Sequence, residues 1–234
     1  MAEVITDAPL SVKTKAVDML ECYLIDADVK RMDDDLKYCQ GSIRYGFDIS
    51  SSIKTTFLLF EDNRSAQDTV DKLNLMNHPS IMRSLGDVIC FDQHLPNHVL
   101  PFPYFDTTYA DYLDKKSNKT FEFKRFTPEF IQLTSQVVHG MSALQEKGFC
   151  CPNLEGKHIA IFKENNCISA KIWHFCICTG CTGDKHTDWR RLGQLLKKTA
   201  VDHKCLTIEI EDLCTKINKG ILEGYALILS LFEC

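Results

Sequence analysis

The sequence predicts an α+β fold in which a small β-rich part precedes a larger, mainly helical part. Two short runs, SIRYGFDI and IKTTFLLF, are separated by a polar serine turn between residues 38 and 60, a pattern typical of antiparallel strands. Farther along, residues 128–148 place apolar side chains at steps of three and four, the period of an amphipathic helix. Strands followed by helices are the order expected of an α+β protein.

Composition and charge narrow the range of functions. The 234 residues are 44% hydrophobic and 25% charged, so the chain can bury a sizeable core in one large domain or in two lobes. The 27 Lys and Arg residues against 32 Asp and Glu residues give a formal net charge of −5. Because a protein that binds a phosphate backbone usually has a basic surface, we expect no nucleic-acid partner.

The twelve cysteines do not by themselves predict a disulfide framework. The first residues, MAEVITDAPLSVKTK, lack the charged start and apolar run of an export signal. The longest apolar stretch, near residues 225–232, is far shorter than the roughly 20 residues that span a bilayer. We therefore expect a cytoplasmic protein, with the nucleus also allowed, that has no membrane partner and keeps its thiols reduced and mostly buried.

The first part of the chain is expected to alternate helices and strands. Apolar residues at helix-like spacing in KTKAVDMLECYL, residues 13–24, predict a helical extension over residues 1–37. Ser65 is a suitable N-cap for the next helix. The β-rich lobe is then expected over residues 38–101. Its expected elements are strands within 38–60, a helix over 65–76, and strands over 82–91 and 98–102.

The second part, residues 102–234, is expected to be mainly helical. Pro128 suits the first turn of the long helix, and Gly148 suits its C-terminal cap. A Cys-, Gly- and Thr-rich loop precedes the last helices. The other expected elements are a short helix at ADYLDKK, strands at HIAIF and SAKIW, a helix over 189–199 and more helix toward the end.

Several segments, taken in order, resemble the eukaryotic protein kinase fold over residues 38–234. NHPSIMRSLGD is similar to the family's HPNI segment, and HVLPFPYF followed by ADYL resembles the hinge and the helix after it. HGMSALQEKGFCCPNLEGKHIAIF matches the spacing of the long helix, the catalytic loop HRDLKPxN and the strand pair behind it. SAKIWHFC and DWRRLG stand where the family has KIxDFG and DxWSLG. Their order and spacing imply a two-lobed kinase-like fold with a shortened activation segment.

The HPSI, hinge and GYALILSLF segments are also similar to the kinase half of the unfolded-protein-response kinase–endoribonucleases. The nuclease extension of those proteins has no counterpart here, so we expect no ribonuclease activity. A different α+β fold is the alternative, in which DWRRLG is an ordinary helix start with Asp188 as its N-cap.

The resemblance places unsuitable residues at the positions that carry kinase chemistry. A kinase needs a strand Lys for the phosphates, a helix Glu that orients it, a catalytic Asp, and an Asn and an Asp that hold magnesium. Near the Glu position, Asp68 and Asp71 neighbour Thr69. In the order of the chain, the degenerate positions are Phe60, Thr69, Asn153, Glu155, His158, His174 and Cys176.

These replacements predict the loss of phosphotransfer and of ATP binding. Asn153 cannot accept a proton from a substrate hydroxyl, and general-base catalysis is worth roughly 10²–10⁴ in rate. Phe60 removes a positive charge and Glu155 adds a negative one, so the cleft should repel ATP. We therefore expect an inactive pseudokinase that acts as a regulatory scaffold and binds another protein, such as an active kinase relative, without a cofactor.

Two other functions stay open at the level of sequence. His158 and His174 replace residues that converge on one magnesium ion in the family, and imidazoles with Cys151 or Cys176 would suit zinc or another transition metal. A separate zinc site is conceivable in the pattern C-x-C-x₂-C-x₄-H, formed by Cys176, Cys178, Cys181 and His186. Alternatively, hinge backbone groups would hold adenine without metal, which would make the chain a nucleotide-binding switch.

Overall fold

The computed structural model divides the chain into two compact units, which are described separately. The first unit comprises residues 1–73 and 83–104, and the second comprises residues 74–82 and 105–234. Both contain small antiparallel sheets, and helices complete an α+β fold, as predicted. The structure describes residues 16–19, 23–26, 42–48, 53–60, 62–90, 98–105, 107–115, 121–122, 125–151, 154–164, 167–173, 178–179, 186–202, 207–220, 226–227 and 229–230.

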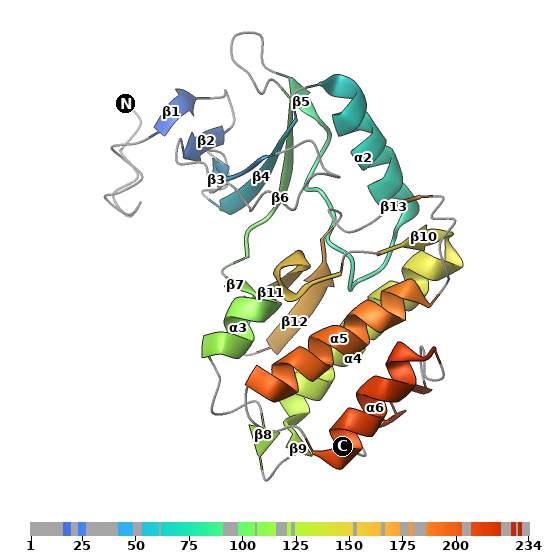
Figure 1. The fold of residues 1–234 in the computed structure, drawn as a ribbon. Helices are drawn as coiled ribbons and strands as arrows, with labels where there is room; N and C mark the ends of the chain where they lie inside the picture. The colour runs from blue at the N-terminus through green and yellow to red at the C-terminus, as the bar shows by residue number, and fades with distance from the viewer. Residues whose placement is uncertain are drawn as a thin grey trace. The chain divides into compact units, whose positions relative to one another are not determined.

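The first unit is built on an antiparallel sheet with the strand order β1-β2-β3-β4-β6-β5 (Figure 1). The central strand β4 pairs with β3 on one side and β6 on the other. Its side chains from Thr55 to Phe60 are all buried, so both faces of this strand are covered, and the sequence shows the run of apolar residues typical of that setting. The strands are β1 (Ala16–Met19), β2 (Tyr23–Asp26), β3 (Ser42–Asp48), β4 (Lys54–Phe60), β5 (Ile89–Cys90) and β6 (His98–Pro103).

The helix expected over residues 13–24 is not formed. Residues 16–19 and 23–26 are instead the strands β1 and β2, and β2 pairs with β3, so the sheet extends into the segment that we expected to be a helical extension. The physical reason is that a short apolar pattern is ambiguous, and pairing with an available strand edge decides it. The strand expected over 82–91 is also shorter, because only Ile89–Cys90 forms β5.

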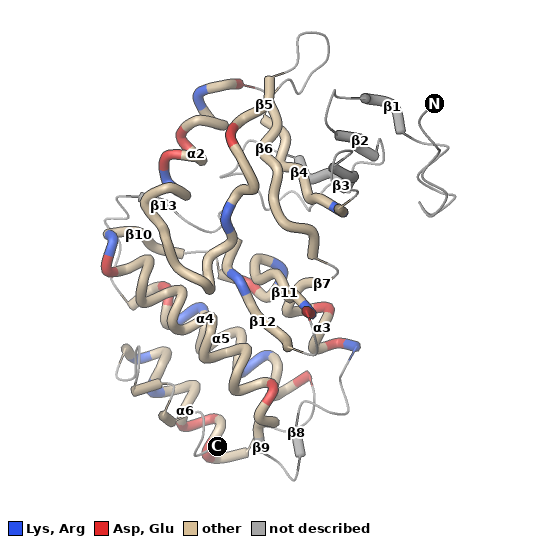
Figure 2. Tube along the Cα trace, turned by 180° about the vertical axis from the view of Figure 1, so that it is seen from behind, with Lys and Arg blue, Asp and Glu red and all other residues tan. Residues whose placement is uncertain are grey.

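Helix α2 (Asn63–Leu75) follows β4 and begins two residues before the predicted start. Its cap is Asp62 and not Ser65, because the Asp62 carboxylate accepts hydrogen bonds from the Ser65 backbone N–H and hydroxyl, both at 2.8 Å. These bonds lower the pKa of Asp62. The exposed side of α2 carries charges of both signs (Figure 2). Its buried side consists of Ala66, Val70 and Leu73.

The second unit is organised by the long helix α4 (Pro128–Glu146). Thr127 caps its first turn by accepting a hydrogen bond from the Phe130 backbone N–H, and Pro128 occupies the first turn as predicted. Gly148 follows the last turn with a φ of 76°, a conformation that favours glycine. The apolar face is buried as the spacing predicts, with Phe130, Leu133, Val137, Met141 and Leu144 in the core.

A three-stranded sheet in the order β12-β11-β7 packs against α4. The Gln136 side chain of α4 accepts a hydrogen bond of 2.7 Å from the Ala170 backbone N–H of β12, which fixes the helix to the sheet. The strands of this unit are β7 (Thr107–Thr108), β8 (Phe121–Glu122), β9 (Arg125–Phe126), β10 (Phe149–Cys150), β11 (Ile159–Glu164), β12 (Cys167–Ile172) and β13 (Cys178–Thr179).

The remaining helices are α3 (Tyr109–Lys115), the 3₁₀ turn η2 (Gly156–His158), α5 (Thr187–Asp202) and α6 (Ile208–Asn218). Helices α5 and α6 lie side by side (Figure 1). Gly193 permits this approach, because a Cβ at that position would lie 2.6 Å from Asn218 Oδ1 and 3.1 Å from Ile217 Cγ2. In the part of the chain that the structure describes, no helix is long and apolar enough to cross a membrane.

Candidate functional site

The HPSI segment, residues 78–81, belongs to the second unit and packs close to the long helix. The Ser80 carbonyl accepts a hydrogen bond from the Ile172 backbone N–H, and the Met82 N–H donates to the Ile172 carbonyl, at 2.8 and 2.9 Å. A Cβ on Gly140 of α4 would lie 3.1 Å from the Ser80 carbonyl oxygen, so glycine permits this close packing. Burial lowers the pKa of His78, and the nearby His139 adds to the shift.

A buried carboxylate anchors the chain that follows α4. Asp188 lies within α5, is 3% exposed, and accepts hydrogen bonds from the Cys151 backbone N–H and from the Gln145 side chain. Burial raises the pKa of Asp188, and these two hydrogen bonds oppose that change. Gln145 also accepts a hydrogen bond of 3.1 Å from Trp189 Nε1. Asp188 is therefore not the N-cap of the alternative interpretation, because α5 begins at Thr187 and the carboxylate faces the core.

The two degenerate positions in the first unit carry no charge. Phe60, at the end of β4, is 4% exposed, and Leu58 and Leu59 beside it are also buried. The Thr69 hydroxyl, in α2, donates a hydrogen bond of 2.8 Å to the Ser65 carbonyl of its own helix. Both side chains are thus used within the unit, one for core packing and one for a local backbone hydrogen bond.

The loop after β10 supplies two further positions. Glu155 is exposed, and its carboxylate lies 3.4 Å from Lys157 Nζ. His158, in η2, is 6% exposed, and its carbonyl accepts a hydrogen bond of 2.9 Å from the Trp173 backbone N–H. A buried imidazole beside a half-buried ion pair is a poor setting for a hard cation, which prefers several oxygen ligands.

Several predicted residues cannot be placed. Asn153, His174, Cys176 and Cys181 lie outside the described residues, as does most of the predicted activation segment, and only the backbone of Cys178 is described. The ring of His186 lies against Gly220, where a Cβ would be 2.8 Å from His186 Nδ1. No group of three or more His, Cys, Asp or Glu side chains suited to a metal ion occurs within the described ranges.

The expectation that the thiols stay reduced is wrong for Cys150. This residue, in β10, is disulfide-bonded, and Cys178 of β13 is its opposite position in the strand pair. The sequence gives no reason to choose this cysteine among the twelve, because the folded chain decides which thiols come within bonding distance. Of the free thiols that the structure describes, Cys151 and Cys214 are buried as small apolar residues, whereas Cys90 and Cys167 are exposed, so the expectation of mostly buried thiols holds for only half of them.

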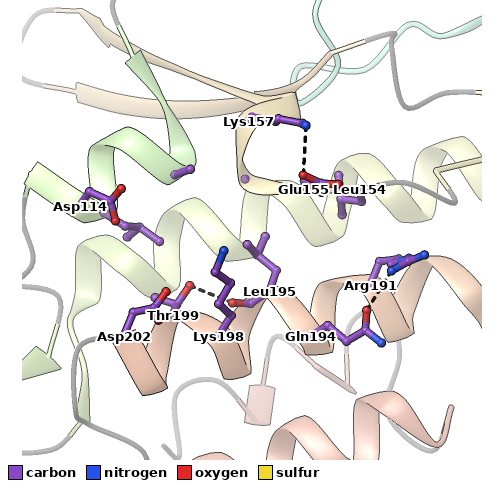
Figure 3. A pocket seen from close by; sticks show the side chains of 13 residues that line it. Asp114, Leu154, Glu155, Lys157, Arg191, Gln194, Leu195, Lys198, Thr199 and Asp202 are labelled. Carbon is purple, nitrogen blue, oxygen red and sulfur yellow. Dashed lines mark hydrogen bonds and ion pairs between the residues drawn. The ribbon is translucent and has the colours of Figure 1, made fainter. Parts of the chain in front are cut away.

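A pocket of about 470 Å³ in the second unit brings together residues that the sequence analysis did not single out, apart from Glu155 (Figure 3). It lies between α3, the loop that leads into η2, and one face of α5. Glycine at position 156 permits the loop to lie close to α3, since a Cβ there would be 3.0 Å from the Ala110 Cβ. The lining residues are Ala110, Leu113, Asp114, Leu154, Glu155, Gly156, Lys157, Arg191, Gln194, Leu195, Lys198, Thr199 and Asp202.

Part of this pocket was visible in the sequence. Arg191, Leu195, Lys198 and Asp202 are spaced by three or four residues, so a helix over this segment places them on one face. Their proximity to α3 and to the loop before η2 has no sequence signal. No family model matches the sequence, and no curated protein matches it either.

Proposed function

We propose that the chain is a catalytically inactive, kinase-like domain that acts as a protein-binding scaffold. The observation that carries the proposal is the difference between anchoring residues and chemical residues. Asp188 keeps a buried, hydrogen-bonded contact with the Cys151 backbone. By contrast, Phe60 and Glu155 stand where the resemblance requires positive charge, and neither can bind phosphate.

The packing of the second unit supports the same interpretation. The resemblance rests partly on HPSI, HGM and DWRRLG, and these segments make contacts that require their particular residue types. Gly140 admits the Ser80 backbone, and Gly193 admits α6. Such contacts maintain a rigid framework, and they need no nucleotide. A rigid framework without catalytic groups is suited to presenting a fixed surface to a partner.

The first test is thermal unfolding with millimolar ATP, with and without magnesium or manganese. A ligand present at 100 times its Kd stabilises a protein by roughly 2.7 kcal/mol, which raises Tm by several degrees for a chain of this size. We expect no shift under any of these conditions, and no transfer of labelled phosphate to a general protein substrate. An active protein kinase assayed in parallel provides the positive control.

Any of three results would contradict the proposal. A magnesium-dependent rise in Tm would mean that the positions of Phe60, His158 and His174 are assigned wrongly and that the domain binds nucleotide. A rise of equal size with ATP and with adenosine, independent of metal, would support the nucleotide-binding switch instead. Labelled phosphate on the substrate would overturn the loss of catalysis directly.

A further inference from the structure

The pocket between α3, η2 and α5 has an apolar floor and a charged rim. Leu113 and Leu154 are buried, and Leu195 is half-buried. The rim residues are exposed, so a ligand can reach them from solvent. These exposed lining residues are Asp114, Glu155, Arg191, Gln194, Lys198 and Asp202. A volume of about 470 Å³ is within the range of small-ligand sites and also suits a few residues of an extended chain.

The charges of the rim differ in whether they are already paired. Lys157 pairs with Glu155, and Arg191 Nη1 donates a hydrogen bond of 3.2 Å to Gln194 Oε1. Within the described part of the chain, the side chains of Asp114, Lys198 and Asp202 form no hydrogen bond or ion pair. Three charged groups beside an apolar floor are therefore available to a ligand.

The charged groups are ordered along the pocket. On α5, Arg191 and Lys198 are separated by about 10 Å along the axis, and Lys198 and Asp202 by about 6 Å, at 1.5 Å per residue. Figure 3 shows Asp114 and Asp202 toward one end, Arg191 toward the other, and Lys198 between them. One end of the pocket is thus acidic, Lys198 lies in its middle and Arg191 at the opposite end, and the ion pair of Glu155 with Lys157 lies between them.

The balance of charges on the rim excludes a nucleic acid as the ligand of this pocket. Asp114, Glu155 and Asp202 balance the positive charges of Lys157, Arg191 and Lys198, so the rim has no net charge for a phosphate backbone. A dipolar ligand with an apolar centre complements it better. The distance of about 16 Å between Arg191 and Asp202 corresponds to roughly five residues of extended chain at about 3.3 Å per residue.

We propose that this pocket binds an extended segment of a partner protein that carries an acidic, an apolar and a basic side chain in that order. The acidic group lies between Arg191 and Lys198, about 13 Å from the basic group in a peptide of five extended residues, and pairs with Lys198. The apolar group covers Leu154 and Leu195, and the basic group pairs with Asp114 and Asp202. The inference rests on the proposed scaffold function, because it names the partner chemistry which that function requires.

The test uses fluorescence anisotropy with labelled, end-blocked peptides that contain Glu, Ala, Leu, Ala and Lys, in both chain directions. We expect one direction to bind, and Lys198→Glu to weaken it about tenfold or more. A peptide in which Lys replaces Glu should regain affinity for the Lys198→Glu protein. Lys147→Glu is the matched control, since it makes the same charge change at an exposed lysine outside the pocket.

Two outcomes would overturn the inference. One is the absence of binding by either peptide to the folded wild-type chain. The other is an equal affinity of the peptide for wild type, Lys198→Glu and Lys147→Glu, which would mean that binding depends on apolar contact alone. The assay contains no nucleotide, so its outcome is separate from the thermal-shift test: an ATP-binding chain that still binds the peptide would refute the scaffold proposal and leave the pocket assignment standing.

Discussion

The two faces of helix α5 serve different purposes. On the face turned to the core, the polar atoms are matched: Asp188 accepts two hydrogen bonds, and Trp189 Nε1 donates to Gln145. On the face that lines the pocket, Lys198 and Asp202 are exposed, and neither side chain has a partner among the described residues. The buried face consists of Asp188, Trp189, Leu192, Gly193, Leu196, Thr199 and Ala200.

The difference follows from where water is available. A buried polar group without a partner costs about 1–3 kcal/mol, so the core face needs a partner for each one. An exposed charge keeps its hydration and can remain unpaired at little cost to folding. The polar residues of one helix therefore divide into those that the fold requires and those that can bind a ligand. The following measurements test this division.

The largest expected effect is that of Trp189→Ala on the core face. Trp189 is 2% exposed, and its removal leaves a large cavity and takes away the donor that pairs with Gln145 Oε1. We expect the free energy of unfolding to fall by about 3–5 kcal/mol, measured by chemical denaturation. Trp189→Phe fills most of the space and loses only the hydrogen bond, so it should lose clearly less. Equal losses for the two variants would argue against cavity formation as the cause.

A smaller effect concerns Asp188 and depends on pH. Its pKa in the folded chain is raised above the ordinary value of 3.8, so the folded state holds the proton more tightly than the unfolded state. The resulting stabilisation is full below pH 3.8 and is lost as the pH rises through the raised pKa. The wild-type chain should therefore be most stable relative to Asp188→Asn in acid. The difference between their free energies of unfolding should then decrease as the pH rises toward neutral.

The exposed Asp202→Asn, on the other face of α5, is the control for this pH series. It should follow the wild-type pH dependence closely, because Asp202 is exposed and without a partner among the described residues. A flat difference between wild type and Asp188→Asn would show that burial does not perturb the Asp188 carboxyl in solution.

The smallest expected effect on stability is that of Lys198→Ala, on the pocket face. Because this ammonium group is exposed and forms no ion pair within the described residues, its removal should change the free energy of unfolding by less than about 0.5 kcal/mol. Chemical denaturation beside Trp189→Ala gives the comparison under identical conditions. A loss of several kcal/mol would place Lys198 among the residues that the fold requires and would remove the distinction between the two faces.

Local sequence signals were reliable where one element contains the whole signal. The helix of residues 128–146 has its first-turn proline and its apolar spacing within a single segment, and both act as expected; Gly148 also ends the helix, although it lies one residue past the C-cap Lys147. The prediction of Ser65 as N-cap failed because Asp62, three positions earlier, is an equally good N-cap residue, and the hydrogen bonds of the folded turn decide between them. The segment 13–24 failed because its pairing partner, β3, lies far along the chain.

The sequence by itself determined the α+β class, the long helix and the longer strands, those of six or seven residues, because propensity, capping and apolar period act between near neighbours. Only the tertiary structure decided that Asp188 is buried with the Cys151 N–H and Gln145 as its partners, that Cys150 is disulfide-bonded, and that Lys198 lines a pocket with Leu154 and has no partner among the described residues. These properties depend on groups from separate segments, and sequence spacing does not specify which segments meet. Burial and the presence of a hydrogen-bond partner therefore distinguish a charged side chain that the fold requires from one that can bind a ligand. Both are properties of the folded chain.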